Sequence, residues 1–209
     1  MIREQRWPKE QVSLFSCYRR NRSRSYPTVQ IHFGIFFSEN KSQMGKALEI
    51  ESLFPMFFYG GYHLAIGYRF SSFRVRVSVI DGGTYDAEPY GVDNSKEYFK
   101  RYYAKPGYGI FFGYNVWQNW DIYMYLERHT FGIEQKATSE ELMMHSTDFG
   151  LGTSYQLFIG KWFYLQPGVH FYFRGPQSVY FSDGREYSIP RMDISPVIRA
   201  GIRIWQIEK

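Results

Sequence analysis

Charged side chains recur on alternate positions of strand-like segments, and they are the residues of this sequence best suited to binding or chemistry. In each segment the charged positions alternate with apolar ones, so the two kinds of side chain point to opposite faces of the strand. If these segments closed into one sheet with the apolar faces outward, the charged side chains would gather inside. A buried charge without a partner is very costly, so such charges must be paired or hydrated. We therefore predict a polar network that plugs the interior. It comprises Arg69, Arg74, Arg76, Asp121, Glu127, Arg199 and Arg203. Because the arginines outnumber the acids, a site for a small anion or a peptide is the functional alternative.

A possible nucleophile and base stand next to each other at His145 and Ser146, with Glu140 and Glu141 close in sequence. Catalysis would need the base within hydrogen-bond reach of the nucleophile and a third group to orient it. Adjacent residues in one segment do not supply that geometry, so we expect a solvated polar loop here. The sequence thus favours a protein that is not an enzyme.

Cofactor and metal motifs are absent from the sequence. It contains no glycine-rich phosphate loop, no Cys/His zinc pattern and no nucleic-acid-binding motif. His129 stands near Glu127 and Glu134, but their spacing matches no particular metal site. We expect no cofactor, no metal and no nucleic-acid partner.

Period-two alternation of apolar and polar residues marks eight candidate strands along the chain. Alternation of this kind indicates strands with two different environments. The eight segments cover residues 28–37, 60–70, 73–80, 106–117, 120–132, 147–158, 162–173 and 193–205. An all-β fold follows, an eight-stranded antiparallel up-and-down transmembrane β-barrel.

Long and short connections alternate between these segments, with long stretches at 38–59, 81–105 and 133–146. All tight turns then fall at one end of the barrel and all long loops at the other, as in barrels of the bacterial outer membrane. The aromatic content of 21% suits the aromatic girdles of such barrels. The alternative is a soluble lipocalin-like barrel, which would turn its apolar rows inward around a ligand and place Arg69, Arg74, Arg76 and Arg199 in water.

Charge divides the chain into two parts. Residues 1–26 hold seven basic and two acidic residues, so this segment carries the whole formal net charge of +5. We predict a basic, disordered segment over 1–26 and a barrel over 27–209. No apolar run near the start is long enough for a secretory signal, although an outer-membrane protein must be exported. The natural start is therefore expected to differ from Met1, or a signal has been removed.

The arrangement of strands, short turns and long loops resembles the small outer-membrane barrels, such as OmpX-like proteins and the transmembrane domain of OmpA-like proteins. The phrases Leu-Gln-Pro-Gly-Val at 165–169 and Asp-Ile-Ser-Pro at 193–196 look like the outer-membrane β-barrel families of Bacteroidetes, including PorT-like proteins. The resemblance implies an outer-membrane location, contact with lipid and lipopolysaccharide, and partners among other envelope proteins. It implies structural, adhesion or secretion-accessory roles, with a lipid A-modifying acyl enzyme as the alternative.

Tyrosines gather in the predicted long loops. Aromatic residues on loops held by a rigid scaffold suit the binding of a partner. The candidates for such an interaction are Tyr85, Tyr90, Tyr98, Tyr102, Tyr103 and Tyr180. Packing between loops is the other explanation that the sequence allows.

Overall fold

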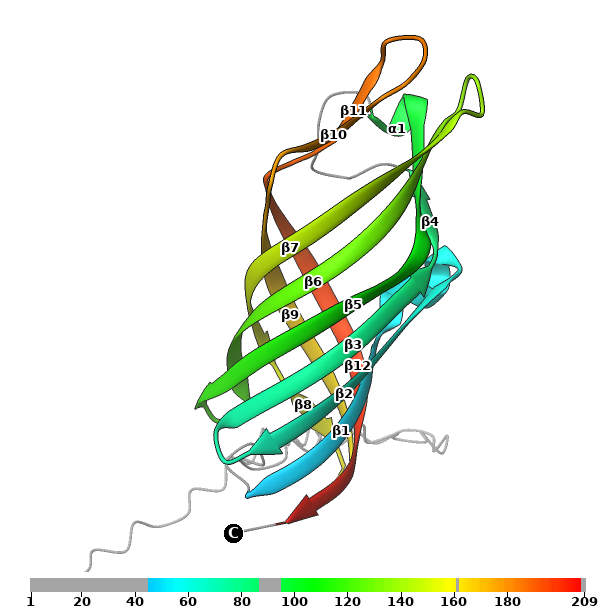
Figure 1. Cartoon of the computed structure of the whole chain (residues 1–209). Coiled ribbons are helices and arrows are strands. Elements are labelled where there is room, and N and C mark those ends of the chain that lie inside the picture. The colour runs from blue at the N-terminus through cyan, green and yellow to red at the C-terminus, as the bar shows by residue number, and fades with distance from the viewer. Residues whose placement is uncertain (1–44, 87–94, 161, 208–209) are drawn as a thin grey trace, which may run out of the picture. The chain divides into compact units, whose positions relative to one another are not determined.

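Eight long strands close into one antiparallel barrel in the computed structural model, which describes residues 45–86, 95–160 and 162–207 (Figure 1). Each strand pairs with the next along the chain, and the last pairs with the first. The strands are β1 Lys46–Leu53, β2 Gly61–Phe70, β3 Phe73–Gly82, β5 Phe99–Trp117, β6 Trp120–Gln135, β7 Glu141–Tyr155, β9 Phe163–Arg174 and β12 Met192–Ile207. The fold class predicted from the alternation is confirmed.

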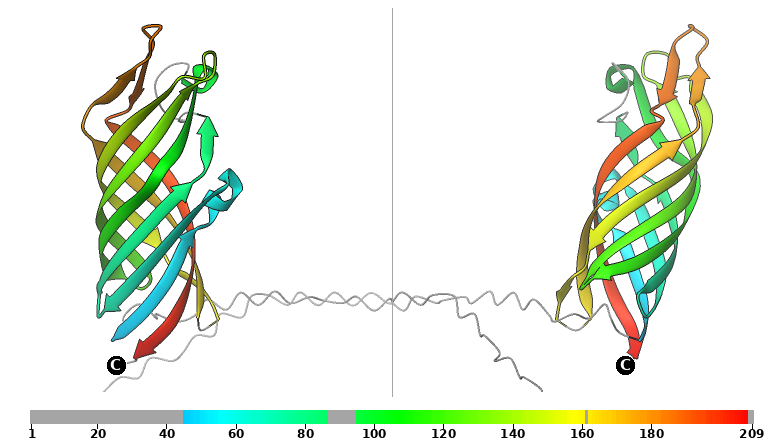
Figure 2. Two further views of the ribbon diagram at one scale, coloured as in Figure 1. Left: turned by 45° about the vertical axis from the view of Figure 1, so that its right-hand side comes forward. Right: turned by 90° about the vertical axis from the view of Figure 1, so that its left-hand side faces the viewer.

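Shorter elements decorate this wall. They are the 3-10 helix η1 Phe54–Tyr59, β4 Thr84–Asp86 beside β5, α1 Ser95–Tyr98, β8 Leu157–Ile159 beside β9, and the hairpin of β10 Gln177–Tyr180 with β11 Glu186–Ile189. The hairpin, α1 and the adjoining ends of β5, β6 and β7 gather at the end of the barrel opposite the end of β12 (Figures 1 and 2). We call this group the crown. No helix in the described ranges is long and apolar enough to cross a membrane.

The first strand of the barrel is not the one that the sequence predicted. Residues 28–37 lie outside the described residues, whereas β1 falls inside the stretch 38–59 that was predicted to be a loop. In β1, Leu48 and Ile50 alternate with Glu49 and Glu51, and the glutamates point inward. The prediction failed because two acidic residues in a short segment are typical of a solvated loop. The arginines that face them in the barrel are not evident from the sequence.

Two predicted loops also contain long stretches of strand. β6 and β7 continue through most of 133–146 and are joined by a short turn, and β5 begins at Phe99 inside the predicted loop 81–105. About 9–11 residues are enough for a tilted strand to cross a bilayer. β5, β6 and β7 contain 19, 16 and 15 residues, so they extend beyond that length, where they pair with one another. The alternation of long and short connections is therefore less regular than predicted.

The two faces of the wall differ in chemistry. Outward side chains such as Ile66, Met124 and Leu126 are each about half exposed, whereas charged residues such as Arg69 and Asp121 are buried inside. An apolar exterior around a polar interior suits a lipid environment, and so large an apolar surface would be a liability in water. The lipocalin-like alternative is wrong, because it requires the opposite orientation of both faces.

Tyrosine rings inside the barrel lie across glycines of the neighbouring strand. A Cβ added to Gly150 would come within 2.0 Å of Tyr125 Cζ, and one added to Gly201 within 2.3 Å of Tyr164 Cζ. Three such pairs stand directly opposite each other in the sheet: Tyr123 with Gly152, Tyr125 with Gly150 and Tyr164 with Gly201. Glycine on one strand makes room for a large ring on the next, which fills a narrow interior.

Two prolines lie within strands without disturbing the main ladder. Arg203 N donates to Trp162 O on the β9 side, so two-residue periodicity turns the nitrogen of Pro196 away from β9. The nitrogen of Pro196 therefore faces the side of β12 on which β1 lies, but β1 ends at Leu53, opposite Arg199, before it reaches Pro196. Pro167 similarly turns its nitrogen away from β12 toward the interruption between β7 and β8. Both prolines therefore occupy positions where no strand needs their missing N–H.

Candidate functional site

Glu49 is the centre of a buried ion cluster in the lower part of the interior, which is the part away from the crown. Its carboxylate accepts hydrogen bonds from Arg203 Nε at 3.0 Å and Arg203 Nη2 at 2.6 Å. Arg74 Nη2 lies 2.6 Å from its second oxygen, and Arg69 Nε lies 3.9 Å from the first. One glutamate of β1 thus contacts arginines of β2, β3 and β12.

Glu51, two residues further along β1, forms a second centre above the first. Arg74 Nη2 donates to it at 2.8 Å, the Tyr164 hydroxyl donates at 3.0 Å, and Arg76 Nη1 also donates to it. Arg199 Nε lies 3.6 Å away. Because Arg74 touches both glutamates, the two centres are one network.

Asp121 on β6 completes this network from the far wall. Arg69 donates to both of its oxygens, at 3.3 and 2.8 Å, and Asn115 donates at 3.1 Å. Neutral groups take some of the remaining donors: Arg69 also bonds Gln156, and Arg74 bonds Gln166 at 3.1 Å. The cluster of Arg69, Arg74, Arg76, Arg199, Arg203, Glu49, Glu51 and Asp121 is at least 96% buried at every residue. We call it the ion cluster.

His170 covers the upper side of the ion cluster. Its Nε2 lies 2.6 Å from Arg199 Nη2, and its Nδ1 lies 2.9 Å from the Tyr172 hydroxyl. A guanidinium can only donate, so Nε2 accepts and the proton of the neutral ring is on Nδ1. His170 therefore adds no positive charge to the five arginines beneath it.

A polar cavity of about 170 Å³ lies above this floor. Its wall carries Glu127, His129, Asp148, Arg174 and Asp193. Arg174 Nε donates to Asp148 at 2.9 Å and its Nη2 lies 3.7 Å from Asp193, while Glu127 lies 3.8 Å from His129 Nε2. The carboxylates of the cavity are therefore concentrated in its upper wall.

All seven predicted interior residues are buried. Six belong to the ion cluster, and Glu127 lies apart from them in the wall of the cavity. The sequence-based reasoning missed Glu49 and Glu51, which connect the arginines, and also Tyr164 and His170. The signal for the glutamates was their two-residue spacing beside Leu48 and Ile50, which matches the spacing of Arg74 and Arg76 on β3.

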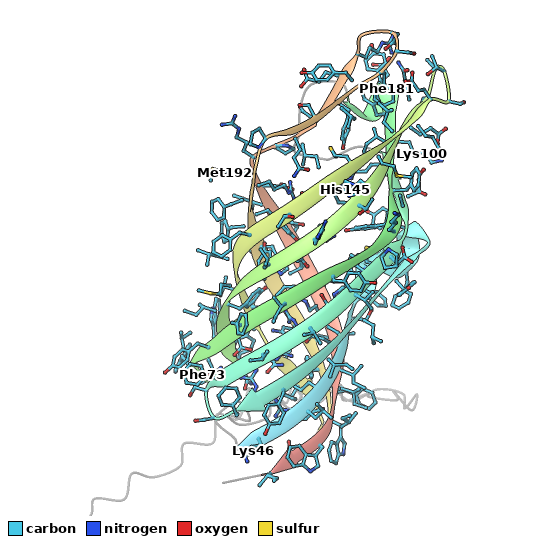
Figure 3. The ribbon with its side chains drawn as sticks, in the orientation of Figure 1. Lys46, Phe73, Lys100, His145, Phe181 and Met192 are labelled. Carbon is cyan, nitrogen blue, oxygen red and sulfur yellow. The ribbon has the colours of Figure 1, made fainter. Side chains whose placement is uncertain are left out.

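His145 and Ser146 cannot act together, because consecutive residues of a strand point to opposite faces. His145 is exposed and its Nδ1 lies 3.1 Å from the Thr130 hydroxyl. Ser146 is buried and donates to Asp148. Figure 3 shows His145 on the barrel wall between the labelled Phe73 and Lys100. The segment is strand and not the predicted loop, so a catalytic pair at these positions is excluded by geometry.

The predicted loop tyrosines have several different positions. Tyr102 and Tyr103 belong to strand β5 and not to a loop, and Tyr103 packs inward against His129 and Phe131. Tyr98 packs on the crown beneath Arg185, and Tyr180 is exposed on β10. Tyr85 lies in β4, whereas Tyr90 falls outside the described residues.

The crown has a hydrophobic core of its own. It consists of Phe99, Phe131, Ile133, Met144, Phe181, Tyr187 and Ile189. Two polar links hold the hairpin against the β6–β7 turn: Gln135 Nε2 donates to Asp183 at 2.6 Å, and Glu140 accepts from Ser182 N and Oγ. A hydrogen bond from the backbone N–H of Arg185, and a second from Gln135, lower the pKa of the Asp183 carboxyl below its ordinary value of 3.8.

These features define the class of the protein: an eight-stranded β-barrel with a lipid-facing exterior, the architecture of bacterial outer-membrane proteins. Two solved outer-membrane structures are similar in fold. Neisserial surface protein A has 14% identity and a TM-score of 0.39, over 76% of this chain and 92% of that one. A major outer membrane protein from Thermus thermophilus has 12% identity and a TM-score of 0.38, over 76% of this chain and 98% of that one.

No family model matches the chain, and no curated protein matches it. Among the described residues, no group of three or more His, Cys, Asp and Glu side chains is arranged to hold a metal ion. Within the described ranges, the ion cluster and the crown are two regions of the barrel with polar or aromatic side chains arranged for a function.

Proposed function

We propose that this outer-membrane barrel is a non-conducting scaffold that presents the crown as a preformed binding surface for adhesion or for assembly with another envelope protein. The observation that carries the proposal is the separate hydrophobic core of the crown, built from residues of β5, β6 and β7 and of the β10–β11 hairpin. A loop without such a core would lose conformational entropy on binding, and a prepacked one loses less.

The ion cluster supports the non-conducting half of the proposal. Side chains from opposite walls meet across the interior, for example Arg69 of β2 with Asp121 of β6 at 2.8 Å and Arg74 of β3 with Gln166 of β9 at 3.1 Å. An eight-stranded barrel has an interior only wide enough for its side chains. Direct contacts from wall to wall are the arrangement expected of an interior that blocks a continuous water column.

The outer surface of the crown supports the binding half. Tyr180 on β10 and Met143 on β7 are both more than half exposed, and the hairpin that carries Tyr180 is tied to the barrel by Gln135 and Glu140. Exposed aromatic and Met side chains on rigid supports are typical of the centres of binding patches.

Adherence of cells tests the crown. A Gram-negative host would display the wild-type barrel, or a variant in which residues 178–188 are replaced by a short Gly-Asn turn, at matched surface levels. We expect the wild type to increase adherence to other cells or to immobilised matrix protein, and the crown variant to lose that increase. Substitution of the Ser71-Ser72 turn, at the opposite end, is the matched control and should retain it. Equal adherence of wild type and crown variant on every surface would contradict the adhesion role.

Conductance tests the plug independently. Purified full-length protein in a planar bilayer should give no steady single-channel current. Stable openings from the folded wild-type barrel would rule out a non-conducting scaffold, whatever the adherence result.

A further inference from the structure

The ion cluster contains more positive than negative charge. Its five arginines face three carboxylates, Glu49, Glu51 and Asp121. His170 is neutral, because its Nε2 accepts from Arg199. The carboxylates Glu127, Asp148 and Asp193 lie in the upper cavity, where Arg174 holds two of them. The excess positive charge therefore remains in the lower interior, where burial makes uncompensated charge very unfavourable.

Among the five arginines of the ion cluster, Arg76 has the most guanidinium nitrogens without a hydrogen-bond partner in the described part of the chain. One face of its guanidinium lies 4.0 Å from the centre of the Phe111 ring, and Nη1 donates to Glu51. Its Nε and Nη2 have no hydrogen-bond partner among the described residues, although the side chain is only 3% exposed. Nε and Nη2 form the edge of the guanidinium with two parallel N–H groups, the edge best suited to an anion.

A small space borders this arginine. It measures about 10 Å³ and is lined by Arg74, Arg76, Phe111, Gly113, Asp121 and Tyr123. Arg74 Nε likewise has no hydrogen-bond partner in the described part of the chain. Asp121 already accepts from Arg69 and Asn115, which offsets its repulsion of a second anion. Three donor nitrogens from two arginines, all unpaired among the residues described, thus belong to side chains that line one space.

The size of the space selects among anions. A space of about 10–15 Å³ holds one water-sized sphere. A halide ion is wider than a water molecule and enters if the lining side chains move apart slightly, whereas phosphate, sulfate or a carboxylate-bearing peptide is several times too large. We propose that the barrel binds one chloride ion inside the ion cluster, against the Nε–Nη2 edge of Arg76 and beside Arg74.

Bromide diffraction tests the position directly. Crystals of the full chain in detergent, grown with sodium bromide in place of sodium chloride, should show an anomalous peak in contact with Arg76 Nη2. The peak should be absent from Arg76→Gln, which shortens the side chain and removes its charge. A wild-type map with no anomalous peak at Arg76, including one with bromide at surface sites only, would overturn the proposal, because the space would then hold water.

Thermal unfolding in detergent gives a second readout that does not depend on the variant folding well. Wild-type protein in sodium chloride should melt about 2–4 °C above the same protein in sodium gluconate of equal ionic strength, because chloride binds only the folded state and gluconate is too large for the space. Arg76→Lys keeps a charge but loses the paired edge, so its chloride-dependent shift should be at least halved. Arg185→Gln in the exposed crown is the matched control and should retain the full shift. Equal melting of the wild type in the two salts would count against the site.

Discussion

Arg203 Nη2 lies 2.6 Å from Glu49 Oε1, and this contact joins the last strand of the barrel to the first across 154 positions of sequence. Both side chains are completely buried. The same two strands are hydrogen-bonded along their backbones, from Lys46 opposite Ile207 to Leu53 opposite Arg199. The ion cluster therefore reinforces the seam where the barrel closes, which among the described strands is the pairing that brings the first strand against the last.

Glu49→Gln tests that role. The amide keeps the shape of the side chain but leaves Arg203, Arg74 and Arg69 with one carboxylate fewer. Removal of one partner from a buried ion pair typically costs about 3–5 kcal/mol, so we expect a loss of that order in the free energy of unfolding. Urea unfolding in lipid vesicles, followed by the heat-modifiable migration of the folded barrel on detergent gels, measures it.

Glu186→Gln is the matched control, because Glu186 is exposed on the crown hairpin. An exposed substitution of this kind is usually within about 0.5 kcal/mol of the wild type. A Glu49→Gln barrel as stable as this control would show that the seam depends on its backbone ladder alone.

The faces and approximate limits of seven strands could be predicted from the sequence, because a lipid-facing row of apolar side chains has a two-residue period that no loop maintains. Residues such as Ile122, Met124 and Leu126 define their face without knowledge of any neighbour. The same reasoning assigned Arg69, Arg74 and Arg76 to the interior. The sequence-based reasoning could not assign β1. Burial of Glu49 and Glu51 is favourable only when the arginines of β2, β3 and β12 surround them, and those contacts are not evident from the sequence.

The crown escaped prediction for a related reason. Phe99, Ile133 and Met144 were assigned to loops, because their strands continue past the length a bilayer requires. Their burial depends on a hairpin, β10–β11, that comes more than thirty residues later in the chain. Packing between segments so far apart has no local pattern in sequence.

Gly201→Ala tests the tyrosine–glycine packing. A Cβ at position 201 would come within 2.3 Å of Tyr164 Cζ, and Tyr164 cannot easily move because its hydroxyl bonds Glu51 and Arg74. Overpacking of a filled interior typically costs about 1–3 kcal/mol, and displacement of the hydroxyl would add to that. We expect equilibrium unfolding to show a loss at or above the upper end of that range.

Gly175→Ala provides the comparison, since a Cβ there meets nothing within 4 Å. It should leave stability unchanged to within about 0.5 kcal/mol. If both alanine variants unfold at the same urea concentration, the rings do not need the glycines.

Ser146→Ala and His145→Ala distinguish a structural from a catalytic reading of β7. Ser146 is buried and donates to the Asp148 carboxylate, so its loss should cost about 1.5–3 kcal/mol. His145 is exposed on the other face, and its loss should cost less than about 0.5 kcal/mol. Neither variant should change the lipid A profile of cells that carry the barrel, as measured by mass spectrometry. A lipid A change that depends on both residues would contradict the separation of the two side chains.

The docking of the crown hairpin should depend on pH at its acidic limit. The backbone N–H of Arg185 and the Gln135 amide donate to Asp183 and lower the pKa of its carboxyl below 3.8. The ionised form is therefore favoured in the folded crown. Its stabilising contribution is fully present above the ordinary pKa of 3.8 and is lost as the pH falls through the lower, folded value.

NMR titration of the Asp183 carboxyl should give a midpoint below 3.8, and Gln135→Ala should raise that midpoint part of the way back, because the bond from the Arg185 backbone remains. Asp183→Asn should abolish this part of the acid dependence of hairpin protection from proteolysis. A midpoint at or above 3.8 in the wild type would mean that the hairpin is held by its apolar core, through Phe181 and Tyr187, without help from the Asp183 charge.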